Sequence, residues 1–449
     1  MGPLACGHDA PPYGPPVCEH IRASAGPLDF VARYTGAGFG QDRVRCECRA
    51  RGEAGEPIET GAICEECFGG GEGGRAGVMG RPEILEHPLD IDPAIEVTTV
   101  PAGLGPISDL APIGGAGAAW LALCDDGRIA RWECATGVWS VASRTTVSVP
   151  EGEKHQPEPV RRLHASRDGR FAAVVVDYGE RGEVFDLSTG MTTMALDGGD
   201  HHAYTVPFSL AFTEHDGRTV VVHRGEWDRL DVSDPATGRL LASWEDAFFH
   251  GAVHVSPEGT YIADDCWIWH PVGGVRVWNL RHWLTEDPFK LDDPEGGDSD
   301  DDSAVILVSC EYFWDRPVVW IDDHRVALGP LGDREGELAP GARIFTLGRT
   351  GRDAGDPPRA GEVMSFAGPD GRFFSDGGLL FSASQAGLEI WDPSDGARIG
   401  VIPGFRPTHH HRQAGELVEL DGERLLRWKI GPALSRRDGS SPRPPGSAA

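Results

Sequence analysis

Short stretches of alternating apolar and polar residues, separated by glycine turns, recur along most of this chain of 449 residues. One unit reads AAWLALC-DDG-RIARWEC-ATG-VWSVAS (118–143), and the next reads RFAAVVVDY-GERG-EVFDL-STG-MTTMAL (170–196). Alternation with a period of two, bounded by Asp-Gly or Thr-Gly turns, is typical of β-strands in hairpins. The 61 glycines and 35 prolines exceed average usage and argue against long helices. The pattern therefore predicts an all-β fold.

Seven such units follow one another between residues 93 and 432. Segments that have the form of an innermost strand and its turn precede three of them: RLHASRDG (162–169), SLAFTEHDG (209–217) and AVHVSPEG (252–259). One residue in each unit is taken as equivalent: Trp132, Phe185, Leu230, Trp278, Phe345, Trp391 and Trp428. Their mean spacing of about 49 residues lies within the period of propeller blades. We therefore predict a seven-bladed β-propeller.

An acidic stretch accounts for much of the widest gap between equivalent positions, which runs from Trp278 to Phe345. Residues 286–302 carry nine Asp and Glu side chains in seventeen positions. We expect this stretch to be a solvated surface loop, because such a density of like charge does not favour burial.

The residues that begin and end the units resemble those of bacterial WD-repeat-like β-propellers. The resemblance covers residues 93–432 and is clearest in LEIWDPSDG (388–396), where Trp391-Asp392 keeps the Trp-Asp pair. It implies a rigid disc whose loops present a protein-binding face.

A scarcity of lysine (three residues) and asparagine (one residue) also suggests a GC-rich bacterial genome.

The last unit is one outer strand short, and AIEVTTVP (94–101) is free to supply it. Such an arrangement would close the ring between the two ends of the repeat region and leave no open blade edge at the seam. We expect this closure.

The first 68 residues hold eight potential metal ligands: Cys6, His8, Cys18, His20, Cys46, Cys48, Cys64 and Cys67. Eight thiolate and imidazole ligands are enough for two four-coordinate zinc ions, which would then be structural. Two pairings fit the spacing. The first four ligands could hold one ion and the last four the other, or the pairs could alternate between the two sites.

The composition of residues 1–68 favours a metal, because this short segment has few large apolar side chains. The N-terminus lacks the basic and apolar regions of a secretory signal, so we expect a cytoplasmic protein and prefer zinc over disulfides. Disulfides, redox-active thiols or incidental cysteines are the alternatives. A glycine-rich linker (69–92) follows, and a polar, proline-rich tail (433–449) is expected to be disordered.

The net charge of −29 makes binding to a nucleic-acid backbone unlikely. No apolar run is long enough to span a membrane. The P-loop pattern, the G-x-S-x-G nucleophile elbow and the H-E-x-x-H zinc motif are all absent from the sequence. We therefore predict a non-enzymatic scaffold for protein partners.

Two pairs of residues are candidates for function. His164 and His254 occupy the same place in two predicted inner strands and could face a central funnel, which would suit the alternative of a propeller hydrolase or lyase with nearby carboxylates. Trp267 and Trp269 lie two apart in CWIWH (266–270). If exposed they would anchor a partner, and if buried they would pack between blades. Four further cysteines, Cys124, Cys134, Cys266 and Cys310, are expected in the core.

Overall fold

The structure is a computed structural model that divides into two compact units, Met1–Glu83 and Ile84–Ala449. In the first unit it describes only the backbone of four strands. In the second unit it describes residues 84–431, except 115–117, 153, 155, 287, 292–303, 314–315, 335–337 and 349–358. The four strands of the first unit form one sheet in the order β2-β3-β1-β4: β1 (Val17–Cys18), β2 (Phe30–Tyr34), β3 (Gln41–Arg45) and β4 (Thr60–Gly61).

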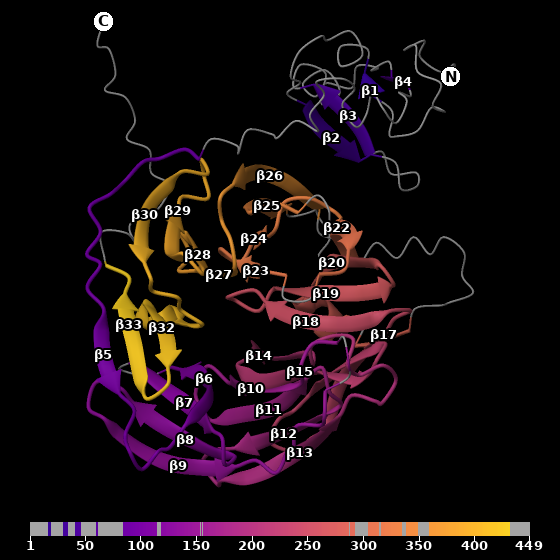
Figure 1. Cartoon of the computed structure of the whole chain (residues 1–449). Coiled ribbons are helices and arrows are strands. Elements are labelled where there is room, and N and C mark those ends of the chain that lie inside the picture. The colour runs from indigo at the N-terminus through magenta and orange to yellow at the C-terminus, as the bar shows by residue number, and fades with distance from the viewer. Residues whose placement is uncertain are drawn as a thin grey trace, which may run out of the picture. The chain divides into compact units, whose positions relative to one another are not determined.

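The second unit consists of seven sheets arranged as blades around a central opening, as Figure 1 shows, so the predicted seven-bladed β-propeller is confirmed. Blade 1 contains β6 (Ile107–Ile113), β7 (Ala119–Cys124), β8 (Arg128–Glu133) and β9 (Val138–Arg144). Blade 2 contains β10 (Val160–Ala165), β11 (Phe171–Asp177), β12 (Arg181–Asp186) and β13 (Met191–Asp197). Blade 3 contains β14 (Leu210–His215), β15 (Arg218–Glu226), β16 (Arg229–Ser233), β17 (Leu240–Glu245) and β21 (Phe289–Leu291).

The remaining four blades follow the same antiparallel plan. Blade 4 contains β18 (Phe249–Val255), β19 (Tyr261–Trp269), β20 (Val272–Asn279) and β22 (Ala304–Glu311). Blade 5 contains β23 (Val318–Trp320), β24 (Arg325–Leu328), β25 (Gly341–Gly348) and β26 (Arg359–Ala367). Blade 6 contains β27 (Arg372–Ser375), β28 (Leu380–Ser384), β29 (Gly387–Trp391) and β30 (Arg398–Pro403). Blade 7 contains β31 (His409–His411), β32 (Glu416–Asp421), β33 (Arg424–Lys429) and β5 (Glu96–Thr99), and the 3-10 turn η2 (Arg412–Ala414) follows β31.

The ring closes as predicted. Strand β5 pairs antiparallel with β33 as the outermost strand of blade 7, with Val97 opposite Leu426, and the two strands lie side by side in Figure 1. The chain just before β5 follows β30 of blade 6, because Leu89 N donates to Ile399 O (2.9 Å). Trp428 Nε1 also donates to Asp92 O (2.9 Å). One segment therefore covers the outer edges of two blades.

The insertion between β20 and β22 contains more structure than the sequence predicts. Helix α4 (Leu280–Thr285) begins at Asn279, whose side chain accepts a hydrogen bond from His282 N (3.0 Å). Strand β21 then pairs in parallel with β17 and adds a fifth strand to blade 3. The expectation of a solvated loop is thus wrong for residues 289–291, while residues 292–303 lie outside the described part. Phe289 and Leu291 are the apolar positions that the acidic composition concealed.

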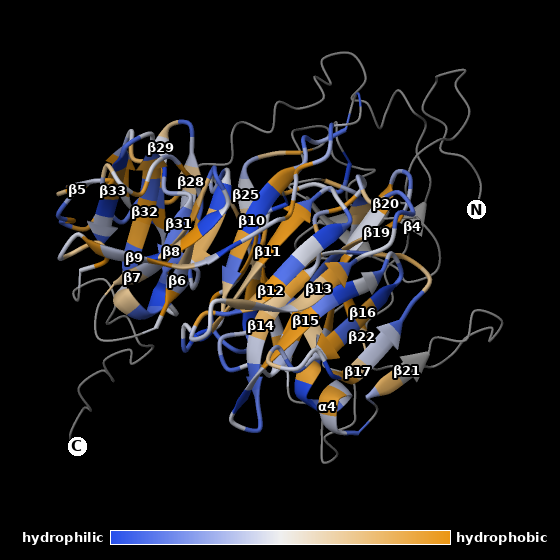
Figure 2. Cartoon of the chain, turned by 90° about the horizontal axis from the view of Figure 1, so that it is seen from below, coloured by the Kyte–Doolittle hydropathy of each residue, from blue (hydrophilic) through white to orange (hydrophobic). Residues whose placement is uncertain are grey.

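Apolar side chains fill the spaces within and between blades, and Figure 2 shows apolar residues concentrated along the strands. Five tryptophans of the described residues are fully buried: Trp120, Trp132, Trp278, Trp391 and Trp428. The four cysteines predicted for the core are buried free thiols, and burial raises the pKa of Cys310 to about 11. In blade 3 the register corrects the predicted equivalence, because Ser233, and not Leu230, stands opposite Val221 at the position that Trp391 holds in blade 6.

An aspartate after the equivalent position shapes the next turn in blades 2, 3 and 6. The carboxylates of Asp186, Asp234 and Asp392 each accept a hydrogen bond from the backbone N–H two residues on, at 2.8–2.9 Å. Each turn then ends at a glycine with a positive φ, such as Gly396 at 74°, where other residues would be strained. These turns explain why the Asp and Gly pattern recurs at blade intervals.

Candidate interaction surface

Six aromatic side chains from blades 3 and 4 and their loops form a continuous cluster, here called the aromatic surface. They are His201, His202, Tyr204, Trp227, Phe249 and Trp267. Phe249 is the centre: its ring lies 4.7 Å from Trp227, 4.8 Å from Trp267 and 5.7 Å from His201, measured between centroids. Phe249 is buried, whereas the two histidines are exposed, so the cluster reaches from the core to solvent.

Strand pairing brings Phe249 and Trp267 together, because they are direct partners of β18 and β19. A β-bulge separates Trp267 from Trp269 on β19. Trp267 therefore packs on Phe249, while Trp269 at the end of the strand is 61% exposed. Trp267 is thus half-buried and packs on its strand partner within blade 4, while Trp269 is exposed.

The exposed end of the cluster is held in an unusual backbone conformation. His202 has a φ of 49°, which non-glycine residues rarely adopt. Its Nδ1 atom lies 2.6 Å from the Tyr204 hydroxyl, and Thr205 N donates to the His202 carbonyl (2.9 Å). Such conformations persist where surrounding contacts enforce them, and they concentrate at functional sites.

Buried polar groups support the strand that carries Phe249. The next residue, His250, pairs through Nδ1 with Asp264 Oδ2 (2.8 Å), and both side chains are almost completely buried. The other oxygen of Asp264 accepts from Gly251 N (3.0 Å), and Ser209 Oγ donates to Gly251 O (2.6 Å). These bonds fix the irregular start of β18. No sequence motif pointed to them, since the bonded residues come from three separate segments of the chain.

The structure places His164 and His254 at equivalent positions on the inner strands of blades 2 and 4, as predicted, opposite Ala173 and Ala263. Burial lowers the pKa of each imidazole to about 4, although Asp109 and Asp264 act in the opposite direction. Neither ring has a hydrogen-bond partner among the described residues. A general base is most effective with a pKa near the working pH, so these features do not favour acid–base chemistry.

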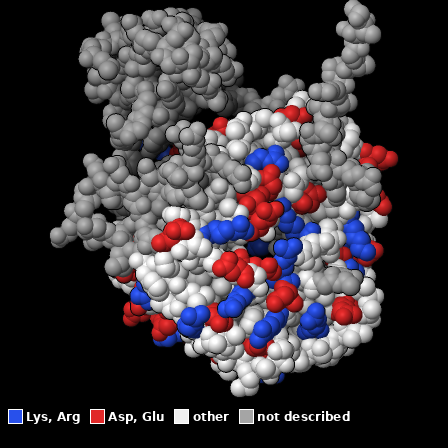
Figure 3. Space-filling model, turned by 180° about the vertical axis from the view of Figure 1, so that it is seen from behind, with Lys and Arg blue, Asp and Glu red and all other residues white. Residues whose placement is uncertain are grey.

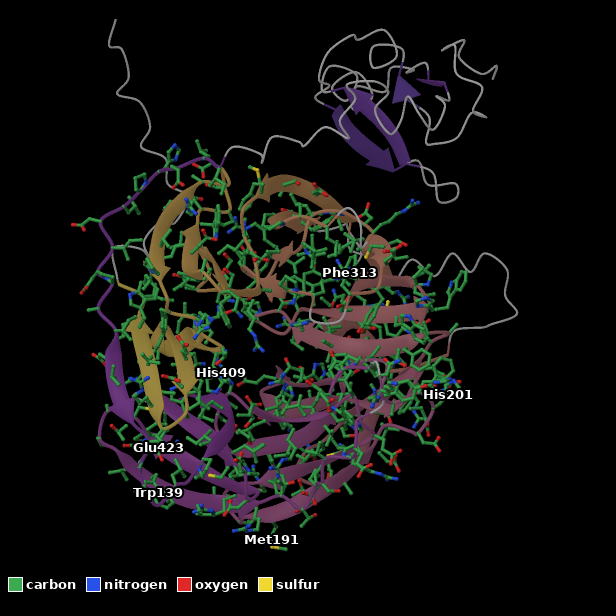
Figure 4. The ribbon with its side chains drawn as sticks, viewed as in Figure 1. Trp139, Met191, His201, Phe313, His409 and Glu423 are labelled. Atoms are coloured by element: carbon green, nitrogen blue, oxygen red, sulfur yellow. The ribbon has the colours of Figure 1, made fainter. Side chains whose placement is uncertain are left out.

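His409 holds the same inner-strand position in blade 7 and does have a partner. Its Nε2 atom lies 2.8 Å from Asp109 Oδ1 of blade 1. Figure 4 shows His409 beside the central opening and His201 at the periphery on the other side of the ring. On the face seen in Figure 3, basic and acidic side chains alternate around the central depression.

A groove of about 470 Å³ lies between blades 1 and 2, and neither candidate histidine lines it. Its walls include Arg131, Ser140, Arg170 and Thr189.

Among the described residues, no three or more His, Cys, Asp and Glu side chains gather as a metal site would require. The side chains of the eight predicted zinc ligands lie outside the described part. No helix in that part is long and apolar enough to cross a bilayer.

The fold is a β-propeller of seven blades, and β5 closes its ring. An aromatic cluster on its loops is partly exposed. The β-propeller domain of Cps50 (Swd1) from Myceliophteria thermophila is similar, with a TM-score of 0.48 and 12% identity over 75% of this chain and all of that one. A chain of the mitotic checkpoint complex is similar at a TM-score of 0.45 and 12% identity, over 78% of this chain and all of that one. No family model and no curated protein matches the sequence. At these scores we transfer no functional residue from either structure.

Proposed function

We propose that this protein is a non-enzymatic interaction scaffold of the bacterial cytoplasm, and that it binds a protein partner through the aromatic surface and Trp269. The observation that carries the proposal is the exposure of Trp269 and the two histidines beside a packed Trp227–Phe249–Trp267 core. Tryptophan and tyrosine are enriched among the residues that dominate binding energy, because they bury a large rigid area at a small entropic cost.

The geometry also suits a stable platform. His250 N donates to Trp227 O (3.2 Å) and Asp246 N donates to Asp228 O (2.8 Å), so backbone bonds join the blade 3 turn to the start of blade 4. A surface fixed in this way loses little conformational entropy when a partner docks on it. The rigid ring therefore holds the aromatic surface in place before a partner binds.

The test is quantitative co-purification from the native cell with the full chain and two matched variants. Trp269→Ala removes an aromatic ring that is 61% exposed, and Phe289→Ala removes one that is 60% exposed on the outer edge of blade 3. We expect at least one protein to be retained by the wild type and by Phe289→Ala but lost with Trp269→Ala. Identical profiles for all three chains would contradict the proposal.

For the N-terminal unit we propose structural zinc, held by Cys6, His8, Cys18, His20, Cys46, Cys48, Cys64 and Cys67. The support is the ligand content of a short segment that has few apolar residues for a core. Tethered to the propeller, such a unit would offer a second contact surface and raise the avidity for a bivalent partner.

Elemental analysis of untagged protein, combined with thiol titration, tests the zinc proposal. We expect about two zinc ions per chain and masking of the six N-terminal thiols until a chelator is added. Freely reactive thiols in a metal-free chain would contradict it.

A further inference from the structure

We infer that the aromatic surface recognises cationic side chains, and that its partner is a basic, arginine- or lysine-bearing segment of another protein. The inference rests on the proposed function and names the chemistry of that partner. Two independent features of the surface support it: carboxylates without cationic partners and tryptophan faces without a cation.

Three carboxylates alternate with aromatic residues along the chain. Asp200 precedes His201, while Glu226 and Asp228 flank Trp227 in the β15–β16 turn. A Cβ atom built at Gly199 would lie 2.5 Å from Glu226 Oε2, so this carboxylate lies against the segment that leads into His201. Among the described residues none of the three forms an ion pair, and Asp200 and Glu226 are exposed.

Nearby carboxylates are neutralised within the chain. Asp197 pairs with Arg181, Asp246 with Arg276, and Asp231 with Arg229 (3.2 Å). The three carboxylates of the aromatic surface therefore lack the cationic partners that these three neighbours have. Unpaired negative charge at a surface attracts cations at long range, and the net charge of −29 strengthens that attraction.

The rings supply the second feature. Around the same blades, guanidinium groups already lie over phenylalanine faces: Arg224 is 4.6 Å from the Phe208 centroid and Arg276 is 4.3 Å from that of Phe248. No guanidinium or ammonium among the described residues lies over Trp227 or Trp267. Tryptophan has the most favourable face for a cation, and a guanidinium that also reaches a carboxylate gains a charge-assisted hydrogen bond.

Arginine is the better fit of the two cations. Its planar group stacks on a ring while its N–H groups donate sideways to a carboxylate, and Glu226 and Asp228 are the chain neighbours of Trp227. A lysine would gain the charge but not the stacking. We therefore expect arginine peptides to bind more tightly than lysine peptides.

The probe is a fluorescein-labelled peptide of alternating arginine and serine, and fluorescence anisotropy measures its binding to the full chain at about 0.15 M salt. The test variants are Glu226→Gln and Asp200→Asn, each nearly isosteric. The matched control is Glu423→Gln, an exposed carboxylate on blade 7 that Figure 4 places far from His201. Circular dichroism and thermal unfolding verify that all three variants fold.

We expect about three- to tenfold weaker binding for each test variant and unchanged binding for Glu423→Gln. Equal weakening in all three variants would show only non-specific attraction to an acidic protein and would overturn the inference, as would unchanged binding in both test variants. If co-purification depends on Trp269 while the carboxylate variants bind the probe normally, the scaffold proposal stands and the cationic partner is wrong.

The tail of this chain, with Arg436, Arg437 and Arg443, is another possible source of cations. The probe is therefore also measured with a chain that ends at Gly431. Unchanged affinity supports a separate partner protein. A large gain in affinity would assign the surface to the chain's own arginines and overturn the inference of an external partner.

Discussion

The imidazole of His409 and the carboxylate of Asp109 lie 2.8 Å apart and join the seventh blade to the first. The second oxygen of Asp109 accepts a hydrogen bond from Leu163 N (2.8 Å) on the inner strand of blade 2. One buried carboxylate thus connects three consecutive inner strands at the seam of the ring. Burial alone would raise the pKa of Asp109, but the hydrogen bond and charge of His409 hold it below its usual value.

Replacing Asp109 should weaken the whole propeller. Asp109→Ala leaves the Leu163 N–H and the His409 ring without their partner, so we expect a loss of about 2–4 kcal/mol in the free energy of unfolding. Urea denaturation measures it. Asp126→Ala is the control, because that exposed carboxylate of blade 1 pairs only at the surface. Similar losses for the two variants would contradict the role of Asp109 at the seam.

Acid should destabilise the protein partly through His164. Its folded pKa is about 4, against about 6.5 in the unfolded chain, so below pH 6.5 only the unfolded state takes up the proton. Stability from this group is therefore lost as the pH falls from 6.5 toward 4. Asp265, whose pKa burial raises to about 7, acts in the opposite direction.

A difference measurement isolates the histidine. Because the ring is only half-buried, solvent screens part of the effect. We therefore expect the stability of His164→Gln to rise by about 1 kcal/mol relative to the wild type between pH 7 and pH 5. The exposed His87→Gln is measured over the same pH range as a control for the loss of a histidine at the surface. Parallel pH profiles for wild type and His164→Gln would show that His164 titrates normally in the folded state.

Removing β5 should open the ring. Deletion of residues 1–100 exposes the edge of β33, so we expect a Tm lower by about 5–10 °C and concentration-dependent association through that edge. Deletion of residues 1–83 keeps the segment that covers blades 6 and 7 and is the matched control. Equal melting of the two truncated propellers in calorimetry would contradict the closure.

A replacement of Phe249 that keeps most of its volume should weaken partner binding more than it weakens folding. We expect Phe249→Leu to cost about 1–2 kcal/mol of stability and to weaken binding of the arginine–serine peptide, because three rings lose their shared aromatic contact. Phe374→Leu, on the inner strand of blade 6, is the control. Loss of probe binding in both variants, or in neither, would contradict a central role for Phe249.

The blade number, the inner strands and the closing strand were predictable because each depends on local patterns of alternation and turn residues. Ser233 was missed since no large side chain marks its position in blade 3. Strand β21 was missed because Phe289–Leu291 is too short to show a period and lies among acidic residues.

The functional geometry was only partly predictable. Trp267 and Trp269 stood out because they are neighbours in the sequence, whereas His201, Trp227 and Phe249 come from three separate segments. Asp109 and His409 are 300 positions apart. Contacts of this kind depend on the closed ring, so no local pattern in the sequence reveals them.

The most direct test of the central claim is hydrogen–deuterium exchange of the full chain, with and without the arginine–serine peptide. We expect protection in 199–206, 226–228 and 267–272, the loops of the aromatic surface, and none in blades 6 and 7. Protection spread over the acidic surface, or confined to the central channel, would contradict the claim that this protein binds its partner through the aromatic surface.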